Sequence, residues 1–135
     1  MIVVRVWYLW TAVLVALVVS PGGAHHSFAA EFDASRPVTL TGTVTELRWG
    51  NPHARFFIDV ENADGVVANW ELELGSPNML IRYKFTRDTI RIGDMVTVEG
   101  FLARDGSSLA NAKSIRLPDG QTLNAGSSSS LGDTR

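Results

Sequence analysis

The chain has 135 residues, with 12 Lys and Arg against 14 Asp and Glu, three His and no Cys. The lack of cysteine excludes disulfides, thiolate metal sites and thiol catalysis. The net charge of −2 argues against nucleic acid as a partner, because binding to a polyanion normally requires a positive protein.

The first 24 residues have the layout of a secretory signal peptide. Arg5 precedes an apolar run over residues 6–19, and small residues follow up to Ala24. The run has about 14 residues, fewer than the roughly 20 that a membrane-spanning helix needs, although an uncleaved anchor is the alternative. Cleavage after Ala24 predicts a periplasmic or secreted chain of residues 25–135 without stable membrane insertion.

Alternating apolar and polar residues predict five β-strands. The first starts at Val38, with a bulge or close backbone approach at Gly42 and a bend near Glu46. The second covers 55–60, and a hairpin turn over 62–65 leads into the third, 66–74. The fourth and fifth cover 95–102, with a bend at Gly100, and 109–117; a short piece over 121–123 follows.

One short helix is predicted between the third and fourth strands. Ser76 is a suitable N-cap, Pro77 suits the first helical position, and residues 78–85 can form two turns. Three strands, a helix and two strands, with a long glycine-containing first strand, is the layout of the OB-fold, a mainly β, five-stranded barrel. An open α+β sheet with one covering helix is the alternative.

These elements divide the chain into a signal peptide (1–24), an N-terminal arm (25–37), an OB-like β-barrel (38–124) and a tail (125–135). The tail is rich in Gly and Ser and is too poor in apolar side chains to fold.

The three histidines are candidate metal ligands. After cleavage, His25 would offer its α-amine and its imidazole to one metal ion, because an amine with a pKa near ~8 loses its proton readily to a metal. His53 follows the turn-forming pair Asn51-Pro52 and would supply a third nitrogen, with His26 as an auxiliary ligand. Three nitrogens in a T-shaped arrangement suit Cu(II), so copper is the expected cofactor.

Two alternatives to this site remain open. Cleavage after Gly23 would give Ala24-His25-His26, in which a third-position histidine binds Cu(II) or Ni(II) together with backbone amides. The plain alternative is a solvated arm and a turn histidine that bonds to nearby backbone.

Other candidate residues suggest a ligand surface that needs no metal. Trp49, next to Gly50, is expected to be exposed, and Phe57 and Asn51 could join it on the barrel face. Trp70 is assigned to the core. Glu71 and Glu73 share a strand face as paired carboxylates would, but a solvated polar face is the preferred interpretation.

Several blocks of sequence resemble a known family. They are His25-His26-Ser27-Phe28, Leu40-Thr41-Gly42-Thr43-Val44, Trp49-Gly50-Asn51-Pro52-His53-Ala54 and Glu73-Leu74-Gly75-Ser76-Pro77-Asn78. They are similar to an uncharacterised family of small exported bacterial proteins, a domain of unknown function, over about residues 25–124. The resemblance implies an OB-like barrel and no established activity. Arg55 departs from it, since an aromatic residue is expected there, and this puts a stacking role for that position in doubt.

The sequence therefore predicts an exported copper-binding barrel that acts as a carrier or buffer rather than an enzyme. The alternative is a metal-free periplasmic module that binds an envelope component, a saccharide or a peptide. An oxygen-activating copper enzyme is a weaker third hypothesis, because no exposed planar substrate surface can be recognised.

Overall fold

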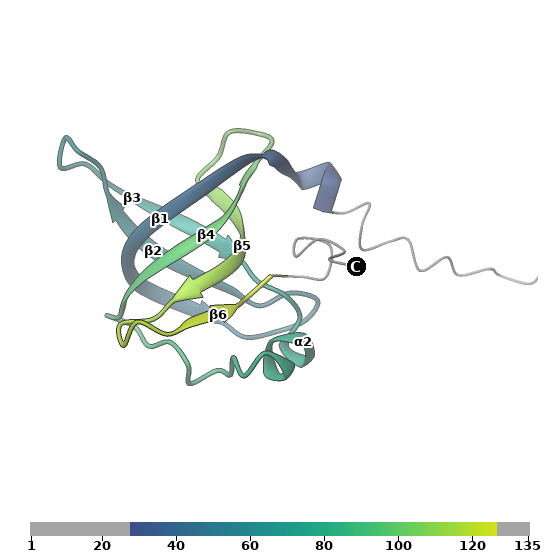
Figure 1. Cartoon of the computed structure of the whole chain (residues 1–135). Helices are drawn as coiled ribbons and strands as arrows, with labels where there is room; N and C mark the ends of the chain where they lie inside the picture. The colour runs from purple at the N-terminus through teal and green to yellow at the C-terminus, as the bar shows by residue number, and fades with distance from the viewer. Residues whose placement is uncertain (1–27, 127–135) are drawn as a thin grey trace, which may run out of the picture.

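The computed structural model of the protein describes residues 28–126 (Figure 1). The predicted signal peptide, His25, His26 and nearly all of the predicted tail lie outside these residues. Within 28–126, no helix has the length and apolar character needed to cross a bilayer. The described part of the chain begins with a helical turn over 28–31. It continues with β1 (Phe32–Arg48), β2 (Arg55–Glu61), β3 (Val67–Glu73), α2 (Pro77–Arg82), β4 (Met95–Ala103), β5 (Leu109–Arg116) and β6 (Thr122–Asn124).

The strands form one sheet in the order β3-β2-β1-β4-β5-β6, in which all neighbours are antiparallel. A parallel pairing between β3 and β5 joins the two sides of the sheet, with Glu71 opposite Leu109 and Glu73 opposite Asn111. The sheet therefore closes into a ring, and the prediction of a mainly β, OB-like barrel is confirmed. The open-sheet alternative is wrong.

The long strand β1 bends, and it can therefore pair with β4 on one side of the barrel and with β2 on the other. Its first part pairs with β4 and its last part with β2, with a register shift between Val44 and Glu46 where the bend was predicted. A Cβ on Gly42 would lie 2.3 Å from the Asp59 carbonyl oxygen, so the glycine permits a close backbone approach. The strand begins earlier than the predicted Val38, since Phe32 is buried and pairs with Ala103.

The barrel interior is filled by apolar side chains. Phe56, Ile58, Leu72, Val98 and Ile115 are among the buried residues that form the core. The predicted bend at Gly100 is present as a register shift between β4 and β5.

The helix α2 begins as predicted and ends earlier. The Ser76 hydroxyl accepts a hydrogen bond from the backbone N–H of Met79, and Pro77 occupies the first turn. The helix buries Leu80 against the core. It ends at Arg82, short of the predicted Phe85, because Lys84 takes a left-handed conformation with φ 61°.

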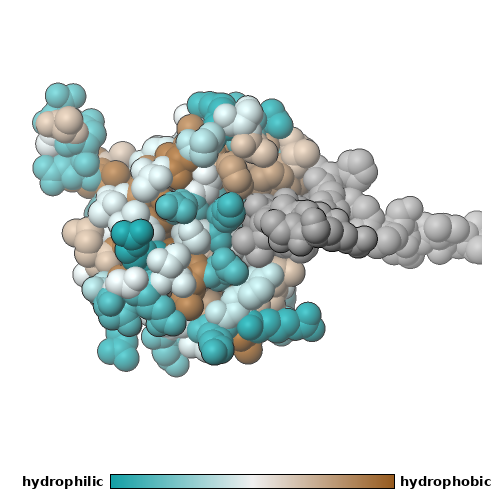
Figure 2. Space-filling view, viewed as in Figure 1, coloured by the Kyte–Doolittle hydropathy of each residue, from teal (hydrophilic) through white to brown (hydrophobic). Residues whose placement is uncertain are grey.

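The hairpin of β2 and β3 projects from the barrel. Its tip is at the upper left of Figure 1, and Figure 2 shows the same tip as a finger that stands away from the rest of the surface. The predicted turn over 62–65 is at this tip, where the Asn62 side chain accepts hydrogen bonds from the backbone N–H groups of Asp64 and Val66.

Candidate functional site

A row of five paired residues crosses the outer face of the barrel. Side chains that are opposite one another in a sheet point to the same face, and Phe56, Leu72 and Ala110, next to members of this row, point into the core. The row consists, in order across β4, β5, β3, β2 and β1, of Phe101, Asn111, Glu73, Arg55 and Arg48.

Glu73 is the buried centre of this row. Only 4% of its surface is exposed, and its carboxylate has three polar neighbours. His53 Nδ1 lies 3.2 Å from Oε1, Asn111 Nδ2 donates to Oε1 at 3.4 Å, and Arg55 Nη2 donates to Oε2 at 3.3 Å. Burial raises the pKa of Glu73, and positive charge on His53 opposes that rise. The negative charge of Glu31, just before β1, raises this pKa further.

His53 is held beside Glu73 by the backbone of the next residue. The Ala54 N–H donates to the Gly75 carbonyl at 3.1 Å, and the Leu74 N–H donates to the Ala54 carbonyl at 2.9 Å. These bonds fix the end of the 49–54 loop, which contains a cis Asn51–Pro52 peptide, against the end of β3. The His53 side chain is 29% exposed, so its ring contacts the buried Glu73 carboxylate on one side and solvent on the other.

Arg55 links two carboxylates that sequence analysis had assigned to solvent. Its guanidinium donates to Glu71 at 2.5 Å and to Glu73 at 3.3 Å. The expectation of a solvated polar face is wrong for Glu73, because β5 pairs with this end of β3 and brings Asn111 next to the carboxylate. The hairpin register places Arg55 opposite Glu73, once the turn is counted from Asn62 to Val66.

Asn111 is the buried residue that sequence reasoning missed. Its Nδ2 donates to Glu73, while its Oδ1 is buried without a hydrogen-bond partner among the described residues. Its position between the buried Ala110 and Ala112 gives no sequence signal of a polar site. Buried polar side chains are normally paired, and within residues 28–126 Asn111 follows this rule through its Nδ2 but not through its Oδ1. Asn111 therefore adds an amide to the polar surroundings of Glu73.

The three residues of the predicted ligand surface do not form one exposed aromatic platform. Trp49 was expected to be exposed, but it is half-buried and stacks on the buried Phe85, with ring centroids 6.2 Å apart and planes at 4°. Phe57 is half-buried, and the Arg48 guanidinium lies 4.6 Å from its ring centroid. Asn51 is exposed. Trp70, assigned to the core, is partly buried against it.

Of the three predicted metal ligands, His53 alone lies within the described residues. Across residues 28–126, no three His, Cys, Asp or Glu side chains come together as a group able to hold a metal ion. A complete site of this kind would therefore need donors from outside that range, and His25 and His26 lie there.

The described chain begins on the same outer face as Glu73. Phe28 packs edge-on against Phe101, with centroids 6.0 Å apart, and Phe101 pairs with Asn111 next to Glu73. Arg104 fixes this start by donating hydrogen bonds to the carbonyls of Ala29 and Glu31. The N-terminal arm thus enters the barrel about two strands, or roughly 10 Å, from Glu73.

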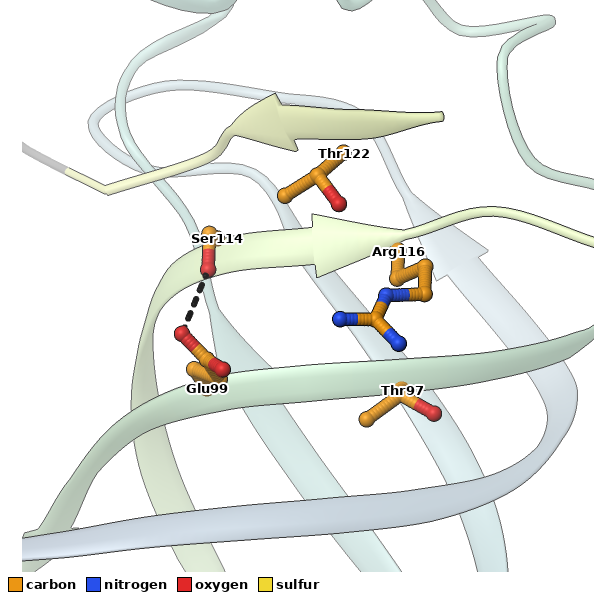
Figure 3. Close-up of a pocket in the computed structure, with 5 residues that line it drawn as sticks. All are labelled: Thr97, Glu99, Ser114, Arg116 and Thr122. Carbon is orange, nitrogen blue, oxygen red and sulfur yellow. Dashed lines mark hydrogen bonds between the residues drawn. The ribbon is translucent and has the colours of Figure 1, made fainter. Parts of the chain in front are cut away.

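A second polar feature is a shallow hollow formed by β4, β5 and β6. It is lined by Thr97, Glu99, Ser114, Arg116 and Thr122, and Ser114 donates to Glu99 at 3.3 Å (Figure 3). It includes none of the predicted site residues, and its lining has no histidine or second carboxylate that would favour a metal.

Comparison with known proteins gives a family and a distant structural likeness. A family model described as "Family of unknown function (DUF6152)" matches residues 13–112. No curated protein matches the chain. A solved structure of the mitochondrial single-stranded DNA-binding protein Rim1 from S. cerevisiae is 15% identical and covers 61% of this chain and 92% of its own, with a TM-score of 0.47. At this level the likeness carries no argument about ligands.

Proposed function

The chain belongs to the Family of unknown function (DUF6152), and from its own residues we propose that it is an exported barrel that binds copper as a carrier or buffer. His53 supplies one imidazole, and His25, as the first residue of the processed chain, supplies its amine and its imidazole. His26 is an auxiliary ligand.

The observation that supports this proposal is the contact between His53 and Glu73. A metal-binding histidine commonly directs its second ring nitrogen to a carboxylate, which orients the ring and raises the basicity of the ligating nitrogen. His53 Nδ1 lies 3.2 Å from a Glu73 oxygen, and this contact leaves Nε2 for a metal ion. The partial exposure of the His53 ring gives an ion access from solvent.

The length of the N-terminal arm is compatible with a shared site. His25 is three residues before Phe28, and three extended residues span about 10 Å. Phe28 packs on Phe101, in the same row as Glu73. An amine and two imidazoles supply three nitrogen donors, which Cu(II) prefers to the oxygen donors favoured by calcium and magnesium.

Copper titration of protein with its native N-terminus tests the proposal. Intact mass first locates the starting residue, and native mass spectrometry reports any retained metal. We expect three additional residues before His25 to lower Cu(II) affinity at least tenfold, since they remove the terminal amine from the His25 chelate and leave neither His25 nor His26 at the third position, where a histidine would bind copper with backbone amides. His53→Gln should lower the affinity as strongly. Glu73→Gln should lower it about 10–100-fold, the range found for residues that orient metal ligands.

Asn51→Ala is the matched control, because Asn51 is exposed in the same loop and is not a ligand in this proposal. Equal affinities of the native and the extended protein would contradict an amine ligand. Exported protein that binds no copper would instead favour the metal-free module.

A further inference from the structure

Exposed apolar and basic side chains share the segment between α2 and the start of β4. We call residues 81–95 the basic rim. Ile81, Ile92 and Met95 are 54%, 74% and 55% exposed, although most large apolar side chains of the barrel are buried. The basic residues of the rim are all exposed, and they are Arg82, Lys84, Arg87 and Arg91.

The charge of the basic rim is opposite to that of the rest of the barrel. It has four Lys and Arg against two Asp, whereas the other described residues have six Lys and Arg against eleven Asp and Glu. Among residues 28–126, the ion pairs involve Arg48, His53, Arg55 and Arg104, and none involves a cation of the rim. The basic rim is therefore a local positive surface on a chain whose net charge is negative.

The barrel holds the basic rim in a fixed conformation. Phe85 and Ile90 are buried in the core. Gly93 donates to the Val44 carbonyl at 2.8 Å, and Val44 donates to the Asp94 carbonyl at 2.9 Å. In Figure 1 the segment from α2 to β4 runs along the lower end of the barrel, so its exposed residues lie at one end of the molecule.

Lys84 occupies a backbone conformation that favours glycine. The Lys84 N–H donates to the Ile81 carbonyl, and the Phe85 N–H donates to the Leu80 carbonyl, which together form a Schellman motif after α2. Its φ of 61° is disfavoured for residues with a Cβ. Residues in disfavoured conformations are often functional, and here the lysine side chain adds a cation to the rim.

We propose that the basic rim docks the protein peripherally on an anionic phospholipid bilayer. The four cations pair with lipid phosphates, and Ile81, Ile92 and Met95 enter the boundary between head groups and acyl chains. A soluble polyanion would satisfy the cations but would leave the three apolar side chains in water, so lipid fits the surface better. This docking needs no metal and does not depend on the proposed copper site.

Vesicle flotation with protein purified from the periplasm of an expression host tests the proposal. We expect binding to vesicles containing phosphatidylglycerol and much weaker binding to phosphatidylcholine vesicles, which also report any contribution from the apolar N-terminal segment. Each cation near an anionic surface contributes about fivefold in affinity, so Arg87→Gln/Arg91→Gln should weaken binding about 30-fold. Salt should weaken it as well.

Arg36→Gln/Lys113→Gln is the matched control, since both residues are exposed outside the rim and the change in net charge is identical. An equal loss in this control, or equal binding of the native protein to both kinds of vesicle, would overturn the proposal. Ile92→Ser should weaken binding several-fold. If it binds like the native protein, the surface is suited to soluble polyanions and the assignment to lipid is wrong.

Discussion

Glu73 shows how the fold keeps a carboxylate buried. Its two oxygens face an imidazole, a guanidinium and an amide. Removing a carboxylate from water costs several kcal/mol, and polar partners offset only part of that cost. The partners do not offset the whole cost, since burial raises the pKa of Glu73 above its ordinary value despite the positive neighbours.

This balance predicts how stability depends on pH. A carboxyl whose pKa is raised on folding stabilises the native state at low pH, and this contribution is lost as the pH rises from the ordinary value of 4.5 through the folded-state pKa. Metal-free native protein should therefore lose stability relative to Glu73→Gln over this interval, by at most about 1.4 kcal/mol per pH unit. Urea unfolding of both proteins at several pH values measures the difference. A relative stability that increases with pH would contradict the burial argument.

The two main residues of the site differ in how far the sequence predicts them. His53 can be selected as a ligand from its residue type and its position after Asn51-Pro52. Glu73 cannot be recognised as buried from its own strand, because it alternates with Leu72 and Leu74 as an exposed residue would. Its burial depends on β5, which approaches from more than thirty residues away.

The helix α2 illustrates the same contrast for a complete element. Its start is local, since Ser76 caps it and Pro77 fits the first turn. Its end is set by the burial of Phe85 and Leu80, which are joined by a backbone hydrogen bond. Lys84 lies between them in a left-handed conformation, and the usual sequence signal for that conformation, a glycine, is missing.

Lys84→Gly should stabilise the protein. Glycine removes a conformational cost of about 1–2 kcal/mol in the left-handed region, and the greater freedom of the unfolded chain returns part of this gain. We expect the free energy of unfolding to rise by about 1 kcal/mol. Thermal or urea unfolding measures this change.

Lys84→Ala separates conformation from charge, because alanine keeps the Cβ and removes the ammonium group. It should give no such stabilisation. If both variants stabilise the protein equally, repulsion among the rim cations is responsible and backbone strain is not.

At the scale of the whole molecule, the barrel is closed by one short parallel pairing. The chain order of strands and helix can be predicted from periodicity, whereas this pairing cannot, since it joins β3 to β5 without a local turn. It covers Glu71, Leu72 and Glu73 on β3. Val67 and Asn69 lie nearer the start of the same strand and pair with β2 alone.

Amide hydrogen exchange should report this difference within β3. The Glu71 N–H donates to the Ser108 carbonyl at 3.0 Å, so it faces β5. The N–H groups of Val67 and Asn69 face the same way by alternation, where no described strand pairs with them. We expect the Asn69 amide to exchange much faster than that of Glu71. Similar protection would indicate that another segment or another molecule covers this edge.

The tight contacts at Gly42 and Gly100 have a consequence for where chemistry can occur. A single added carbon would lie 2.3 Å from the Asp59 oxygen at Gly42 and 2.1 Å from the Asn111 oxygen at Gly100. Phe56, Ile58 and Ile115 fill the barrel interior, which leaves no room there for a ligand. A ligand must therefore bind the outer surface, where substitutions can change specificity while the interior stays unchanged.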